Sequence, residues 1–149
     1  MKPWHVILQR IVLASVLVLL PIAASHAQSA PASPLRVALK GHDTVAYFTE
    51  SKAVKGAKDI AYDWDDARYQ FSSAKNRQMF SSNPDRYSPQ FDGLCATGLA
   101  MGMKAEADPN VWKIVEGKLY VFSSPQALEM AEKDPNILAR SHTAWKASK

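Results

Sequence analysis

The chain has 149 residues, 47% of them hydrophobic and 21% charged, and its formal net charge is +4 at pH 7. This length suits one domain of ordinary size. The basic residues gather in no stripe, so the charge gives little support for binding to nucleic acid. Because Cys95 is the single cysteine, an internal disulfide is excluded and stability must come from packing.

Residues 1–27 are typical of a cleaved signal peptide. Lys2 and Arg10 supply a positive start, an apolar run covers residues 11–24, and Ser25-His26-Ala27 resembles a cleavage site. Cleavage after Ala27 would remove both basic residues and lower the net charge to about +2. We therefore predict a periplasmic or secreted protein that keeps no stable membrane anchor. An uncleaved N-terminal anchor is the alternative, which the shortness of the run disfavours.

The remaining chain divides into a leader and one domain. Residues 28–34 are small, rich in proline and uncharged, which predicts a flexible leader. Residues 35–149 show no second linker and no internal repeat that we recognise, so they are interpreted as a single domain. Residues 35–39 favour a short strand at its start.

The first hairpin and helix of this domain are predicted from alternation and capping. Large apolar and aromatic side chains recur at every second position around a turn at Asp65-Asp66, at Ile60, Tyr62 and Trp64 before it and at Tyr69 and Phe71 after it. Ser73 can then cap a helix over residues 74–81, which Asn83-Pro84 would end.

A second hairpin and two further helices follow. Residues 111–115 and 118–122 flank a turn at Glu116-Gly117, where glycine supplies the positive φ of a tight turn. Prolines then open helices over residues 126–133 and from residue 135 toward Trp145. The order predicts a small single α+β domain with two antiparallel β-hairpins packed against helices. Its expected aromatic core is Trp64, Tyr69, Phe71, Phe80 and Trp112.

Four runs resemble the exported branch of the YHS-domain family, and together they span most of residues 39–145. The runs are Gly41-x-Asp43-x-Val45-Ala46-Tyr47-Phe48, Tyr69-x-Phe71-x-Ser73-Ala-x-Asn76-Arg77-x-x-Phe80, Asn83-Pro84-x-x-Tyr87-x-Pro89-Gln90-x-x-Gly93-x-Cys95-Ala96 and Trp112-x-Ile114-Val115-x-Gly117-Lys118-Leu119-Tyr120.

The resemblance implies a small α+β module related to the metal-handling domains of heavy-metal transporters, where paired cysteines hold the ion. This chain departs from that pattern, because Ser72, Ser73 and Asn76 stand where the metal-binding relatives place their cysteines. It also has His42 where the exported branch usually has tyrosine. The resemblance therefore implies the fold but carries over no thiolate cluster.

Cys95, Met101 and Met103 supply soft sulfur donors of the kind that select Cu(I). If residues 94–103 form one helix, Cys95 and Met103 are separated by two turns, about 12 Å along the axis. One ion cannot bridge that distance, and the spacing instead gives an apolar stripe with Leu99. We therefore expect the methionines to belong to the core.

Cys95 follows the turn signal Asp92-Gly93, so we expect it in the first turn of a helix, where the positive end of the helix dipole favours a thiolate. Together with Cys95, His42 and Asp43 are the candidate metal ligands, for copper or zinc. Each has an ordinary alternative. Cys95 can be a core residue, His42 an exposed loop residue, and Asp43 an acceptor for backbone amides in a turn. His142 is expected at the surface or at a helix end.

Three functions remain open. The first is an exported YHS-type binding module that binds a soft or borderline metal ion, or a small ligand, near Cys95 and His42. The second is a thiol-dependent enzyme using Cys95, and the third is a structural or interaction module without a ligand. Since the chain has no recognised catalytic motif, a non-enzymatic role is favoured, with a metal ion or another exported protein as the partner.

Overall fold

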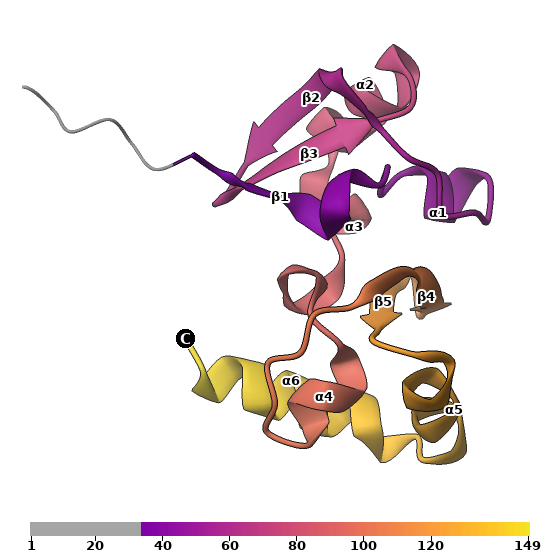
Figure 1. Ribbon diagram of the computed structural model, residues 1–149, viewed down its shortest axis with the longest axis vertical. Helices are drawn as coiled ribbons and strands as arrows, with labels where there is room; N and C mark the ends of the chain where they lie inside the picture. The colour runs from indigo at the N-terminus through magenta and orange to yellow at the C-terminus, as the bar shows by residue number, and fades with distance from the viewer. Residues whose placement is uncertain (1–33) are drawn as a thin grey trace, which may run out of the picture. The chain divides into compact units, whose positions relative to one another are not determined.

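The computed structural model describes residues 34–149. The predicted signal peptide and all but the last residue of the predicted leader lie outside the described residues. The described part is a small α+β domain with a three-stranded and a two-stranded sheet and six α-helices, which confirms the fold class (Figure 1). None of the helices within residues 34–149 is long and apolar enough to cross a membrane.

The first half of the domain is a hairpin followed by helices. The elements in chain order are β1 (Arg36–Val37), the 3₁₀ helix η1 (Ala38–Gly41), α1 (Ala46–Thr49), β2 (Ala57–Trp64), β3 (Ala67–Phe71), α2 (Ala74–Ser82) and α3 (Pro84–Tyr87). Strand β3 pairs antiparallel with β2 and parallel with β1. Ser73 caps α2, as predicted, because its side chain accepts a hydrogen bond from the Asn76 amide at 3.1 Å.

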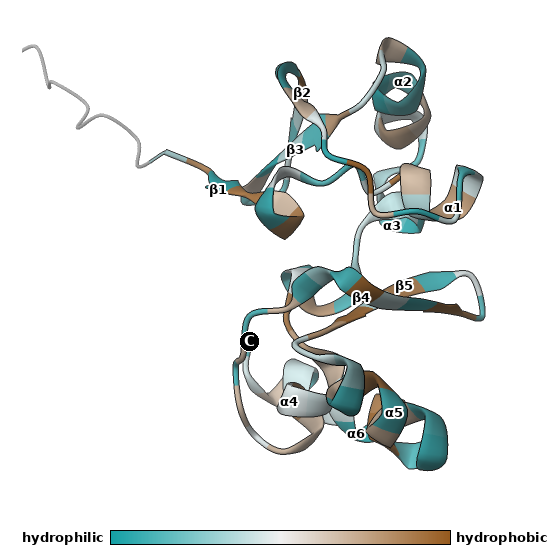
Figure 2. Ribbon diagram, turned by 45° about the vertical axis from the view of Figure 1, so that its right-hand side comes forward, coloured by the Kyte–Doolittle hydropathy of each residue, from teal (hydrophilic) through white to brown (hydrophobic). Residues whose placement is uncertain are grey.

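The second half has the same order of elements from its 3₁₀ helix onward, without a strand that corresponds to β1. They are the 3₁₀ helix η2 (Gln90–Gly93), α4 (Ala96–Ala100), β4 (Asp108–Val115), β5 (Lys118–Phe122), α5 (Pro125–Lys133) and α6 (Asn136–Ala147). Strands β4 and β5 pair antiparallel, and Ser124 caps α5 as Ser73 caps α2. Helix α5 carries both brown and teal residues, as an amphipathic helix does (Figure 2).

The two halves are an internal repeat, which the sequence analysis missed. The pattern Tyr-x-Phe-Ser-Ser-x5-Met-x4-Pro begins at Tyr69 and again at Tyr120. The strand registers repeat as well, including the bulge that separates the outermost pair of each hairpin from the pairs at its turn. We call residues 36–87 the first repeat and residues 88–147 the second repeat.

Each repeat opens with a turn in the left-handed backbone conformation. In η1, Leu39, Lys40 and Gly41 have φ values of 43°, 51° and 78°. In η2, the three residues at positions 91–93 have φ values of 59°, 56° and 81°. Non-glycine residues rarely adopt this conformation, and bulky ones such as Leu39 least of all. The strain is therefore built into the same place twice.

Three clusters of buried side chains form the core. One lies in the first repeat around Phe71 and Phe80, and one in the second repeat around Tyr120 and Phe122. The third joins the repeats, with residues of both in contact. Its members are Leu39, Tyr47, Ala107, Leu119 and Val121, with Phe48, Ala53, Trp112 and Ile114 packed against them.

The predicted single aromatic core is therefore wrong in one member. Trp64, Tyr69, Phe71 and Phe80 do belong together in the first repeat. Trp112 instead packs in the cluster that joins the repeats, where its ring meets the edge of Tyr47 with 5.1 Å between ring centroids. The difference arises because side chains alternate along β4: Val111 and Val115 pack in the second repeat, whereas Trp112 and Ile114 face the cluster that joins the repeats.

Residues 94–103 do not form the single helix considered from the sequence, and the expectation that the methionines belong to the core is wrong. Helix α4 ends at Ala100 because Gly102, with φ of 77°, takes the left-handed position that closes a helix. The Met103 amide then donates to the carbonyl of Gly98 at 2.9 Å, which completes this type of helix end. Met101 and Met103 are consequently 53% exposed each, so they are not core residues.

Candidate functional site

Asp43 is a fully buried carboxylate that organises the first repeat. One carboxylate oxygen accepts from the backbone amides of Val45 and Ala46, at 2.9 and 3.3 Å. The other accepts from the amide and hydroxyl of Ser72 and from the Asn76 side-chain amide, at 2.7 to 2.8 Å. Because five donors occupy both oxygens, Asp43 ties the start of α1 to the start of α2. This is the turn-forming alternative considered from the sequence.

Cys95 takes the position of Asp43 in the second repeat. It is 1% exposed and precedes α4, and its Sγ accepts a hydrogen bond from the Gly98 amide at 3.3 Å. It packs with buried side chains of the second repeat, including Phe91 and Tyr120. The thiol therefore acts as a helix cap inside a hydrophobic core, and reagents cannot reach it in the folded chain.

The repeat explains why the structure does not bring the predicted metal ligands together. Asp43 and Cys95 are equivalent residues of different repeats and cap different helices. Within residues 34–149, no three or more histidine, cysteine, aspartate or glutamate side chains form a group that could hold a metal ion.

His42 lies beside Asp43 in sequence but has its own environment. Its Nδ1 lies 3.1 Å from the carbonyl oxygen of Leu39, to which it donates in the neutral tautomer that fits this contact. Burial lowers the pKa of His42, and the nearby ammonium groups of Lys55 and Lys40 lower it further. His42 is thus a half-buried neutral imidazole that supports the η1 turn.

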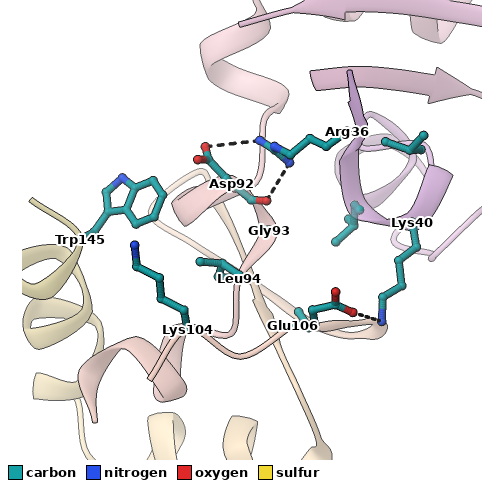
Figure 3. Close-up of a pocket in the computed structure, with 11 residues that line it drawn as sticks. Arg36, Lys40, Asp92, Gly93, Leu94, Lys104, Glu106 and Trp145 are labelled. Carbon is teal, nitrogen blue, oxygen red and sulfur yellow. Dashed lines mark hydrogen bonds and ion pairs between the residues drawn. The ribbon is translucent and has the colours of Figure 1, made fainter. Parts of the chain in front are cut away.

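A cleft of about 410 Å³ lies where the two left-handed turns meet. We call it the turn cleft (Figure 3). Its lining comes from both turns, from the segment after α4 and from α6. The residues are Arg36, Val37, Leu39, Lys40, Asp92, Gly93, Leu94, Lys104, Glu106, Ala107 and Trp145.

Positive charge exceeds negative charge by one in this lining, which holds three basic and two acidic side chains. Lys40 Nζ lies 3.5 Å from Glu106 Oε2, but both side chains are mostly exposed, so this ion pair contributes little to stability. Lys104 forms no ion pair with any residue in the described part of the chain. Figure 3 shows Lys104 extending toward the ring of Trp145, which forms one side of the cleft.

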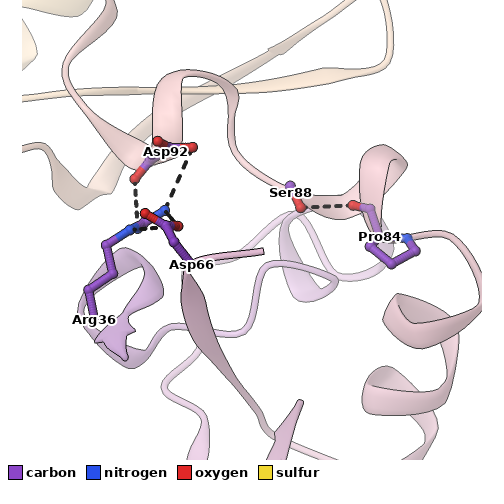
Figure 4. Close-up of polar contacts among 5 residues, drawn as sticks. All are labelled: Arg36, Asp66, Pro84, Ser88 and Asp92. Carbon is purple, nitrogen blue, oxygen red and sulfur yellow. Dashed lines mark hydrogen bonds and ion pairs between the residues drawn. The ribbon is translucent and has the colours of Figure 1, made fainter. Parts of the chain in front are cut away.

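Arg36 links the two repeats at the edge of the turn cleft (Figure 4). Its guanidinium donates to Asp66 at 3.0 Å and to the backbone carbonyl of Asp92 at 3.2 Å. The carboxylate oxygen Oδ1 of Asp92 lies 3.6 Å from Nη2 of Arg36. Because Arg36 donates to it, the pKa of the Asp66 carboxyl is held below its usual value. Arg36 thus fixes the strained η2 turn against the first repeat.

The same arrangement occurs at the equivalent turn. The carbonyl of Lys40, which corresponds to Asp92, accepts a hydrogen bond from the ammonium group of Lys55. At both turns a cationic side chain therefore donates a hydrogen bond to a carbonyl of the left-handed backbone segment. These contacts keep the walls of the turn cleft in place before any ligand arrives.

The sequence analysis missed the residues of the turn cleft. It placed a ligand near Cys95 and His42, neither of which lines the cleft. It did not find Lys104 or Trp145, because they lie far apart in sequence and belong to no motif. The repeated pattern from Tyr69 and Tyr120 would have shown that residues 38–41 and 90–93 are equivalent turns.

Comparisons with protein-family models, curated proteins and solved structures find no match to this chain. A function for this chain therefore has to be inferred from the residues and geometry described above.

Proposed function

We propose that this protein is a non-enzymatic binding module whose turn cleft binds a small organic anion. The observation that carries the proposal is that Arg36, Lys40 and Lys104 line the same cleft as Trp145, with Lys104 extending toward the Trp145 ring. A carboxylate or phosphate would pair with Lys104, and an apolar portion would lie against Trp145 and Leu94.

The strained turns support this assignment. Strained backbone that the surrounding structure holds in place is concentrated at binding and active sites. Of the non-glycine residues with left-handed backbone, Leu39, Lys40 and Asp92 line the turn cleft. Cations on the carbonyls of the last two hold them rigidly, which lowers the entropy lost on binding.

The metal and thiol alternatives have weaker support. A metal ligand or nucleophile needs an accessible sulfur, whereas Cys95 Sγ is buried and already accepts a backbone hydrogen bond. Copper or zinc binding near Cys95 and His42 stays a prediction. Metal analysis of protein purified without an affinity tag, with copper, zinc and iron each tested, would decide it.

We further propose that the chain is exported and belongs with the exported YHS-type modules that it resembles. The supporting features are the sequence of residues 1–27 and the four motif runs. Mass spectrometry of protein from the exported fraction tests the export part. A mature chain beginning at Gln28 is expected, and one that keeps residues 11–20 would contradict the proposal.

The test of the turn cleft uses calorimetric titration of the chain with benzoate and with citrate. Both anions are expected to bind, more weakly as ionic strength rises, and to quench the fluorescence of Trp145. Lys104→Ala should weaken binding about fivefold, as expected for the loss of about 1 kcal/mol from one exposed charge.

Lys58 provides the matched control, because it is an exposed lysine of β2 outside the turn cleft. Lys58→Ala should leave the affinity unchanged, and Cys95→Ser should do so as well. Equal losses in Lys104→Ala and Lys58→Ala would show only a nonspecific charge effect. That result, or no binding by either anion, would contradict the proposal.

A further inference from the structure

The internal repeat allows one half of the protein to be compared with the other at equivalent positions. Trp64 pairs with the first residue of β3, and Val115 pairs with the first residue of β5. Phe80 is the seventh residue of α2, and Ala131 is the seventh residue of α5. The second repeat therefore has small side chains at the two positions where the first repeat has large aromatic ones.

In the first repeat these rings fill the space between hairpin and helix. Phe80 is fully buried, and its ring centroid lies 4.4 Å from that of Tyr69, 5.2 Å from Phe71 and 6.1 Å from Trp64. A fourth ring, that of Tyr62, lies 6.0 Å away. One phenyl ring thus occupies the centre of an aromatic cage.

In the second repeat the same space is a groove of about 580 Å³, within the size range of small-molecule sites. We call it the hairpin groove. Val115 and Ala131 line it where Trp64 and Phe80 would stand, while Tyr120 and Phe122 correspond to Tyr69 and Phe71. Two rings of the aromatic cage are therefore kept, 4% and 1% exposed beneath the groove, and the central ring is missing from the sequence.

The polar groups of the hairpin groove are concentrated at one place. Tyr120 Oη and His142 Nε2 lie 2.9 Å apart, and both residues line the groove. The ring of His142 is held by an edge contact with Phe91, with 4.8 Å between centroids. The sequence analysis expected His142 at the surface or a helix end, whereas it is a half-buried residue in the body of α6.

Both members of this pair are uncharged near neutral pH. Burial lowers the pKa of His142, and the ammonium groups of Lys118 and Lys146 lower it further. Burial also raises the pKa of the Tyr120 phenol. The pair thus offers neutral donors and acceptors, and an uncharged polar group suits it better than an ion does.

We propose that the hairpin groove is a second binding site, which takes a small aromatic molecule with one uncharged hydrogen-bonding group. Its ring lies in the groove against Val115, Ala131 and Leu138, which cover the buried rings of Tyr120 and Phe122. Its polar group bonds to the Tyr120–His142 pair. The site is separate from the turn cleft, since the two share no lining residue.

The test titrates the full chain with phenol, toluene and 1-hexanol at millimolar concentrations. Phenol is expected to bind most tightly, toluene more weakly and 1-hexanol weakest, because a flat ring fits the space that an aromatic side chain fills in the first repeat, and only phenol among the two rings adds a hydrogen bond. Tyr120→Phe should weaken phenol about fivefold, the value of one neutral hydrogen bond, and leave toluene unchanged.

The decisive variant restores the residues of the first repeat. Val115→Trp combined with Ala131→Phe should weaken binding of phenol and toluene by more than about tenfold, because the new side chains fill the groove. Lys104→Ala, in the turn cleft, is the control and should bind phenol normally. Circular dichroism checks the fold of each variant, and the Tyr120→Phe comparison stands if the doubly filled variant fails to fold.

Several results would overturn the proposal. They are failure of the unaltered chain to bind phenol, undiminished binding after a folded variant fills the groove, and equal affinity for 1-hexanol and phenol. Sedimentation that shows a dimer for the unaltered chain and a monomer for the filled variant would assign the groove to a second copy instead. Each readout is independent of anion binding in the turn cleft.

Discussion

At the scale of single residues, the repeat places Asp43 and Cys95 at equivalent positions, where both accept hydrogen bonds from backbone amides at the start of a helix. Asp43 accepts five hydrogen bonds from two elements, while Cys95 accepts one, from Gly98. Asn76, which donates to Asp43, is matched by Ala127 in the second repeat, at the third position of its helix. The second repeat thus has apolar packing around the Cys95 thiol, which caps α4, where the first repeat has the hydrogen-bond network of Asp43.

The capping role of Cys95 leads to a prediction about substitutions. Cys95→Ala leaves the buried Gly98 amide without its acceptor and should lower the free energy of unfolding by about 1–2 kcal/mol. Cys95→Ser keeps an acceptor at a preferred capping position and should lower it less than Cys95→Ala does. Denaturant titration of both variants measures the difference.

The same burial predicts that a thiol reagent labels Cys95 slowly in the folded chain and quickly after unfolding. Labelling of the folded chain as fast as that of the unfolded chain would contradict the structure. If added Cu(I) or Zn(II) then suppressed the labelling, the metal-binding alternative would replace the capping role.

At the scale of elements, the two hairpins use different residues at equivalent left-handed turn positions. Asp65 has φ of 54° and Glu116 has φ of 50°. Aspartate and asparagine tolerate this conformation, whereas glutamate has no short side chain to stabilise it. Gly117 follows with φ of 74°, which confirms the predicted role of glycine in the second turn.

This difference predicts the outcome of a matched pair of variants. Glu116→Asn creates the favoured Asn-Gly turn and should raise the free energy of unfolding by about 0.5–1 kcal/mol. Asp65→Asn, the control in the first hairpin, should change it little. The two melting temperatures give the comparison, and an equal effect of both changes would show that turn conformation is not the cause.

At the scale of the whole molecule, the two histidines with altered pKa lie in different repeats but influence stability in the same direction. Burial is the main cause of the lowered pKa of both His42 and His142. The unfolded chain therefore binds more protons than the folded chain once the pH falls below the ordinary histidine pKa of 6.5. Their contribution to stability is complete above 6.5 and is lost as the pH falls through the folded pKa values.

Thermal melting should accordingly show lower stability at pH 5 than at pH 7.5. At pH 5 the aspartates with lowered pKa, whose ordinary value is 3.8, still keep their charge, so they do not confuse the result. His42→Gln and His142→Gln together should reduce the difference between the two pH values. If the double variant loses as much thermal stability between pH 7.5 and pH 5 as the unaltered chain does, the two histidines are not the cause of the pH dependence.

Local sequence was sufficient to predict the two hairpins and the helices α2, α5 and α6, but not the short helices α1 and α3 or the two 3₁₀ turns. Alternation around Asp65-Asp66 and Glu116-Gly117 predicted both hairpins, and Ser73 predicted the start of α2, because turn and cap preferences act within a few residues. The α+β class followed from the order of these elements. Local sequence left open whether residues 94–103 form one helix, and the left-handed conformation of Gly102 ends α4 at Ala100.

Only the tertiary structure decided which side chains meet. The candidate ligands Cys95, His42 and Asp43 have suitable chemistry, but the repeat assigns Cys95 and Asp43 to equivalent, separate positions. Lys104 approaches Trp145, and Tyr120 bonds to His142, through packing of elements distant in the chain. The sequence determines the chemistry of each side chain. Which side chains come into contact depends on how the two repeats and their helices pack, and binding sites form from those contacts.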